Sequence, residues 1–158
     1  MKSSSPQAPH SPLILELKAE HVAILKALDG VKREIIGGQG GKVMLAARVL
    51  LLAHLKKEDD QLYGVLQAKA RDDANLARTL TVFAADMQEI SGFAIAFFGK
   101  IGRQGGGADA AQDFGKLFGM LGNRIRREEI ILYPAYDLAV QKGAPSSVPT
   151  DRIPLKPG

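Results

Sequence analysis

Imidazole and carboxylate side chains in this chain fall at spacings that would let them hold one metal ion. His54 and Glu58 are four positions apart, so both would project from the same face of a helix. In an earlier segment the apolar residues recur at helical spacing, and His21 falls on the apolar face, or seam, that they form. Glu128 falls on the corresponding seam of a later segment. Such a donor set suits iron, manganese or zinc better than calcium or magnesium. The pattern therefore predicts a transition-metal site inside a helical protein.

The segment around His54 occurs a second time with its leading residue changed. Residues 54–63 read HLKKEDDQLY and residues 124–133 read RIRREEIILY, so both have an aliphatic residue, two cations, two acids and a final Leu-Tyr. Histidine leads the first copy and Arg124 leads the second. A weaker correspondence upstream pairs His21 with Met87. The chain thus resembles two related helical hairpins, of which only the first has imidazoles on its seams.

Four amphipathic segments must position these residues. The breaks that precede or separate them are Ser11-Pro12, the glycine-rich residues 37–41, Asp72-Asp73 and residues 102–107. A small polar residue followed by proline is typical of a helix start, and glycine clusters are typical of loops. Amphipathic helices joined by short loops predict an all-α fold, an up-down-up-down four-helix bundle with its site built inward from facing helices.

The domain boundaries follow from composition. Residues 1–10 and 143–158 are rich in Ser and Pro and are predicted to be disordered tails, which leaves residues 11–142 for the bundle. Within the last helix, Pro134 should either kink the helix or end it. The glycines of that helix have two interpretations: close packing against a neighbouring helix, which we favour, or a small-residue face for a partner. These glycines are Gly115, Gly119 and Gly122.

Length and charge limit the classes of function. The chain has 158 residues, is 46% hydrophobic and contains no cysteine, which excludes thiolate metal sites and is compatible with a cytoplasmic location. No apolar run approaches the roughly 20 residues of a membrane span, so we expect no membrane association. The net charge is +4, but cations alternate with acids, so we expect no nucleic acid partner. We expect a monomer or a weak homodimer, and the sequence leaves open whether the chain also binds another, unidentified protein.

Taken together, the residues resemble the hemerythrin-like, or HHE cation-binding, domain over about Leu13 to Leu138. That family has a histidine in helix one, His-x-x-x-Glu in helix two, histidine in helix three, and histidine followed by a carboxylate in helix four. The resemblance implies a four-helix bundle around a carboxylate-bridged di-iron centre. The metal ligands it implies here are His21, His54, Glu58, Glu128 and Glu129.

Two departures change what the resemblance implies. Met87 stands where a helix-three histidine is expected, and Arg124 stands at the helix-four histidine. One iron of the pair therefore has no imidazole, and we expect one Fe, Mn or Zn ion at most, or none. Reversible dioxygen carriage in that family takes two electrons, one from each iron. We therefore expect a cation-binding, sensing or regulatory protein that is neither a dioxygen carrier nor an enzyme.

Other interpretations stay open at this point. The histidines are also compatible with hydrogen-bonded packing residues, and Glu58 with a side chain that faces water. Arg124 is compatible with a side chain reaching solvent, or with an internal cation that neutralises Glu58 and Glu128. In the second case the protein would be a metal-free bundle acting as an interaction or signalling module. A phosphotransfer role for His54 would require that its ring face solvent.

Overall fold

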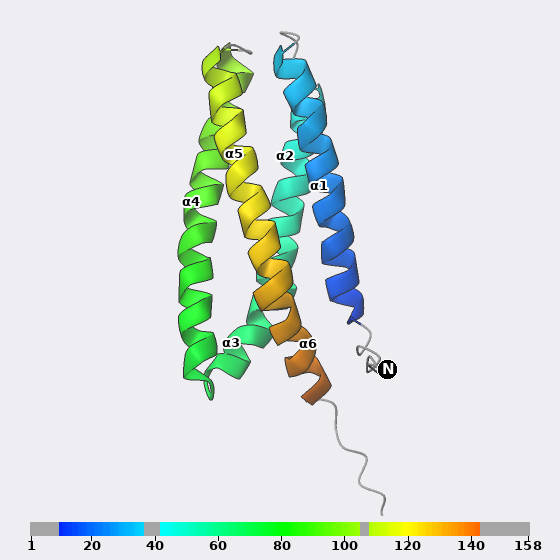
Figure 1. Ribbon diagram of the computed structural model, residues 1–158, viewed down its shortest axis with the longest axis vertical. Helices are drawn as coiled ribbons and strands as arrows, with labels where there is room; N and C mark the ends of the chain where they lie inside the picture. Colours follow the sequence, from blue (N-terminus) through cyan, green and yellow to red (C-terminus); the bar gives the residue numbers. More distant parts are fainter. Residues whose placement is uncertain (1–9, 37–41, 105–107, 143–158) are drawn as a thin grey trace, which may run out of the picture.

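The computed structural model describes residues 10–36, 42–104 and 108–142. Its elements are α1 (Pro12–Ile36), α2 (Lys42–Lys57), the π-helical turn η1 (Glu58–Tyr63), α3 (Gly64–Ala70), α4 (Ala74–Gln104), α5 (Ala108–Arg127), the π-helical turn η2 (Glu128–Leu132) and α6 (Tyr133–Lys142). They form four antiparallel rods that run up, down, up and down (Figure 1). The first rod is α1, the second is α2 with η1, the third is α4, and the fourth is α5 with η2 and α6, while α3 leads across the lower end from the second rod to the third. The predicted all-α bundle is confirmed, and no described residue is in a strand.

Helix starts follow the local signals. α1 begins at Pro12, and its first backbone bond runs from the Leu15 N–H to the Ser11 carbonyl, 3.1 Å. α4 begins at Ala74 because the Asp73 side chain accepts a hydrogen bond from the Leu76 N–H at 3.1 Å, as an N-cap residue does. The two tails predicted to be disordered lie outside the described residues, except for His10, whose ring bonds to Asp137.

The two copies of the repeated segment share a local distortion. Each forms a π-helical turn that begins at its first acid, Glu58 in η1 and Glu128 in η2. A π-turn takes an extra residue into the helix and so rotates the residues on its C-terminal side about the helix axis. As a result the acid, the Leu and the Tyr of each copy all face inward. The fourth rod also continues through Pro134 as α6, so the proline does not end the helix.

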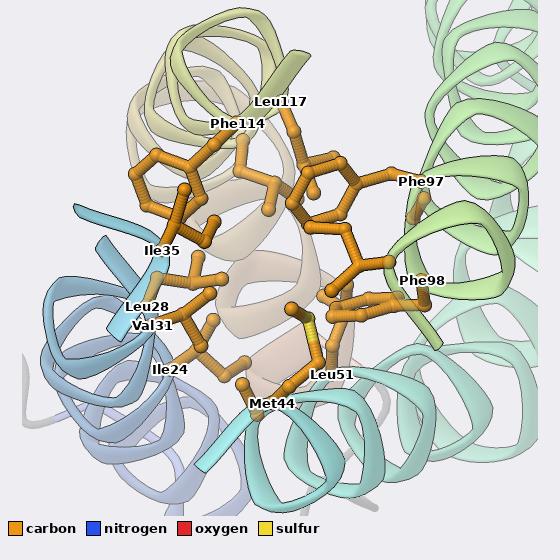
Figure 2. Packing of buried hydrophobic residues seen from close by; sticks show 14 of the residues in the cluster. Ile24, Leu28, Val31, Ile35, Met44, Leu51, Phe97, Phe98, Phe114 and Leu117 are labelled. Atoms are coloured by element: carbon orange, nitrogen blue, oxygen red, sulfur yellow. The ribbon is translucent and has the colours of Figure 1, made fainter. Parts of the chain in front are cut away.

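Two apolar clusters fill the bundle. The upper cluster packs aromatic residues of α4 and α5, among them Phe97 and Phe114, against aliphatic residues of α1 and α2 such as Val31 and Leu51 (Figure 2). The lower cluster gathers around Phe83 and Tyr133 near α3 and α6. Burial of each large side chain contributes about 1.5–3 kcal/mol, so these two clusters supply most of the driving force for folding.

A polar layer separates the two clusters. On each of the four helices, one buried residue of each cluster borders the layer: Leu17 and Ile24 on the first, Leu62 and Leu51 on the second, Phe83 and Ile90 on the third, Leu132 and Leu121 on the fourth. Within the layer lie the buried polar side chains His21, His54, Glu58, Arg124 and Glu128. The site is therefore enclosed between two layers of apolar side chains in the interior.

The glycines of α5 do not serve close packing. A Cβ added at Gly115, Gly119 or Gly122 would meet nothing within 4 Å, apart from the helix's own backbone and neighbouring residues. The favoured interpretation of these glycines is therefore wrong for the isolated chain.

α4 is the one helix among the described residues that is long and apolar enough to cross a membrane, judged by length and composition alone. A helix that packs in the core of a bundle can meet the same criterion, and α4 supplies residues to both apolar clusters.

Candidate metal centre

Four of the five predicted ligands converge in the polar layer. His21 comes from α1, His54 from α2, Glu58 from η1 and Glu128 from η2, and each residue is at most 3% exposed. Each offers one ligand atom, and these atoms all lie within 4.8 Å of one another. Glu129 lies outside this group, with its side chain 36% exposed.

The separations between the inner atoms match those expected around a single ion. The Nε2 atom of His21 lies 3.1 Å from Nε2 of His54 and 3.1 Å from Oε2 of Glu128. The Nε2 atom of His54 lies 3.0 Å from Oε1 of Glu58. Nitrogen and oxygen ligands sit about 2.0–2.2 Å from zinc and similar ions, so two ligands at right angles are about 3 Å apart. These spacings are therefore those of neighbouring ligands.

Carboxylates on the outer side set the tautomers of both rings. The Nδ1 atom of His21 lies 3.0 Å from Oε1 of Glu129, and Nδ1 of His54 lies 3.1 Å from Oε1 of Glu20. Glu20 is in turn paired with Lys57, which helps to hold its pKa below the usual range despite partial burial. Because a carboxylate only accepts hydrogen bonds, each Nδ1 carries a hydrogen, and each neutral ring therefore directs the lone pair of its Nε2 atom inward.

Glu58 has an unpaired oxygen inside the protein. Its side chain is fully buried, and its Oε2 atom has no hydrogen-bond partner. Burial raises the pKa of this carboxyl above its usual range, although the hydrogen bond with His54 lowers that pKa in part. Burial by itself lowers the pKa of His54, but hydrogen bonding to Glu58 and its negative charge raise it above the ordinary value. A buried carboxyl oxygen without a partner, beside two imidazoles whose Nε2 atoms face inward, fits a cation or a proton at this position.

Arg124 neutralises the other acid of the layer. Its Nε donates to Oε1 of Glu128 at 2.5 Å, while its Nη1 donates to the carbonyl of Phe83 and its Nη2 to the hydroxyl of Tyr63, both at 2.6 Å. The guanidinium also lies over the Phe83 ring, 4.8 Å from its centroid. Burial alone would raise the pKa of Glu128, but His21 and Arg124 lower it below the usual range. The solvent-reaching interpretation of Arg124 is wrong, because this side chain is only 4% exposed.

Some residues of the centre had not been singled out from the sequence. The Tyr133 hydroxyl donates to Oε1 of Glu58 at 2.8 Å and lies 3.0 Å from Nε2 of His21. Tyr63 holds Arg124 through its hydroxyl, and Glu20 orients His54. The two tyrosines are the last residues of the repeated segments, so the repeat carried a signal that seam position alone did not. Met87 is half-buried and lines a surface hollow of about 330 Å³ next to Tyr63.

A comparison with known families agrees with this geometry. The family model described as hemerythrin HHE cation binding domain matches residues 13–136. The chain belongs to this family. No curated protein and no solved structure matches it. The resemblance predicted from His21, His54 and Glu58 is thus confirmed, and the buried cluster is the candidate cation site of this hemerythrin-like domain. A phosphotransfer role is disfavoured because His54 is 3% exposed.

Proposed function

We propose that this hemerythrin-like protein binds a single transition-metal cation through His21, His54, Glu58 and Glu128. One observation supports this most strongly: the two Nε2 atoms lie 3.1 Å apart, while both Nδ1 atoms are already committed to carboxylates. Two lone pairs facing each other at this distance repel unless a cation or a proton lies between them. When bound, the ion supplies Lewis acidity and, if it is iron, one-electron redox chemistry.

The charges of the layer support one ion rather than two. Glu58 and Glu128 bring two negative charges, and the Arg124 guanidinium offsets one of them. Glu128 divides its two oxygens, with Oε1 toward Arg124 and Oε2 toward His21. Its Oε1 is therefore unavailable as a bridge to a second ion. A single non-haem ion cannot supply the two electrons that dioxygen carriage takes in this family, so the proposed role is cation binding for sensing or regulation, and not gas carriage or catalysis.

Metal titration of stripped protein tests this proposal. Purified without a metal-affinity step and reconstituted with Fe(II), Mn(II) or Zn(II), the chain should take up one equivalent. His54→Gln should abolish this uptake, because it removes one of the two inward lone pairs. His10→Gln is the matched control, since His10 is the remaining histidine, is 41% exposed and bonds to Asp137 at the surface. Uptake below about a tenth of an equivalent would refute cation binding. Uptake of two equivalents would refute the single-ion centre.

The second candidate is a metal-free interaction or signalling module. Arg124 favours it, because the guanidinium already satisfies Glu128 without a metal. In that case protons on the inner nitrogens would replace the cation. Failure of reconstitution together with a folded, monomeric or dimeric chain would select this candidate.

A further inference from the structure

Tyr133 occupies a place at the centre that differs from that of the orienting carboxylates. Its side chain is fully buried, and its hydroxyl contacts two inner atoms, Oε1 of Glu58 at 2.8 Å and Nε2 of His21 at 3.0 Å. Glu20 and Glu129 instead contact the outer Nδ1 atoms. A residue that only orients a ligand touches its far side, whereas Tyr133 touches the side that faces the ion.

Four inner atoms form a closed ring. Around it, Nε2 of His21 lies 3.1 Å from Nε2 of His54, which lies 3.0 Å from Oε1 of Glu58. The Tyr133 oxygen closes the ring with separations of 2.8 Å and 3.0 Å. The half-diagonal of a square with sides of about 3 Å is about 2.1 Å, within the usual metal–ligand range. The phenol oxygen thus completes the set of neighbours that the two imidazoles and Glu58 begin.

The second copy of the repeat shows the same arrangement around a cation that is present. There the guanidinium of Arg124 donates hydrogen bonds to Oε1 of Glu128, which belongs to the same copy, and to the hydroxyl oxygen of Tyr63, which belongs to the other copy. Tyr63 accepts this hydrogen bond, so its oxygen lone pair faces the positive charge. Tyr133 reaches across in the opposite direction, toward Glu58 and His21. Each tyrosine therefore directs its oxygen to the cation position of the other hairpin.

From these contacts we propose that the phenol oxygen of Tyr133 is a further ligand of the cation, alongside His21, His54, Glu58 and Glu128. This inference rests on the proposed function. Coordination replaces the O–H bond of Tyr133 by a bond to the ion, and the proton is released to solvent, as is general when protein ligands bind metals in their deprotonated form. A phenolate is a hard, anionic donor, so Tyr133 would favour the ferric over the ferrous ion and would offset its additional charge.

Spectroscopy and affinity together test this ligand. Ferric-loaded wild-type protein should show a visible tyrosinate-to-iron charge-transfer band, which Tyr133→Phe should lose. The same variant should bind Zn(II) about tenfold or more weakly, still at one equivalent. Tyr136→Phe is the matched control, because Tyr136 is half-buried beside the lower apolar cluster and outside the centre: it should keep the band and bind Zn(II) within about twofold of wild type. Far-UV circular dichroism checks that both variants are folded.

The outcomes separate the two proposals. A wild-type protein that binds one equivalent but shows no charge-transfer band with Fe(III) overturns the Tyr133 ligand and leaves the single-ion centre intact. So does a Tyr133→Phe variant that keeps the band and the affinity. A wild-type protein that takes up no metal overturns both. If Tyr133→Phe does not fold, the band in the wild-type protein still decides.

Discussion

Replacement of Arg124 by methionine is the sharpest test of the internal cation. Methionine is unbranched and flexible like the stem of arginine, so the change removes the charge and the donors while keeping an apolar stem of similar shape. Glu128 would lose its partner at 2.5 Å, and the Phe83 carbonyl and Tyr63 hydroxyl would each lose a donor at 2.6 Å. The side chains of Arg124 and Glu128 are only 4% and 2% exposed, so bulk solvent has little access to these groups.

The size of the effect follows from burial. Removing one partner of a buried ion pair leaves an uncompensated charge and costs about 3–5 kcal/mol. The whole domain is expected to be stable by about 5–15 kcal/mol, so a large part of the stability would be lost. At about 2–4 °C per kcal/mol for a chain of this size, Tm should fall by at least about 6 °C.

The measurement is thermal and urea unfolding of the metal-stripped protein, followed by circular dichroism at pH 7. Arg126→Met is the matched control, because Arg126 lies two positions further along the same helix and is exposed. This control should change the free energy of unfolding by less than about 0.5 kcal/mol. An Arg124→Met variant as stable as Arg126→Met would refute the idea that Arg124 acts as an internal cation.

Two further changes probe the scaffold. Gly119→Ala should raise the free energy of unfolding by about 0.5–1 kcal/mol, because alanine favours the helix and its Cβ would meet nothing within 4 Å. Gly30→Ala should gain less, since its Cβ would lie 3.1 Å from Val43, and urea midpoints that rank the two variants the other way would contradict this account. Asp137→Asn should cost about 0.5–1 kcal/mol at pH 7, because Asp137 accepts bonds from Ser11 and His10. Burial raises the pKa of Asp137, but those bonds lower it below the ordinary value, so the pKa is lower in the folded than in the unfolded protein. The stabilisation is therefore present above about pH 4 and is lost as the pH falls through the folded pKa. Urea unfolding at several pH values checks this, and a cost of Asp137→Asn that stays constant into acid would contradict it.

Much of the fold was predictable because its signals are local. Proline at position 12, the capping Asp73 and the glycine-rich breaks mark helix ends whatever the tertiary structure. The inner ligands were predictable because they share seams with large apolar residues, and a seam has to face the core. Register alone placed His21 and His54 in the interior.

The rest depended on a backbone feature that the sequence pattern does not reveal. A regular α-helix cannot easily turn Glu58, Leu62 and Tyr63 all inward, and the π-turn that does so has no simple residue signature. The hydroxyls of Tyr63 and Tyr133 therefore had no predicted role. The choice between Glu128 and Glu129 was open for the same reason, since neighbouring residues near a rotated turn exchange faces.

If the proposed ion is bound, the guanidinium at the centre has a consequence for metal scarcity. A positive charge that is covalently part of the chain cannot be chelated or exchanged for a competing ion. In the proposed single-ion centre, Oε1 of Glu128 would therefore keep its counter-charge when iron, manganese or zinc runs short, while its Oε2, His21, His54 and Glu58 would lose their ion. The charge of Arg124 is permanent whereas that of the proposed ion depends on supply, so starvation for metal would remove the ion without unfolding the protein.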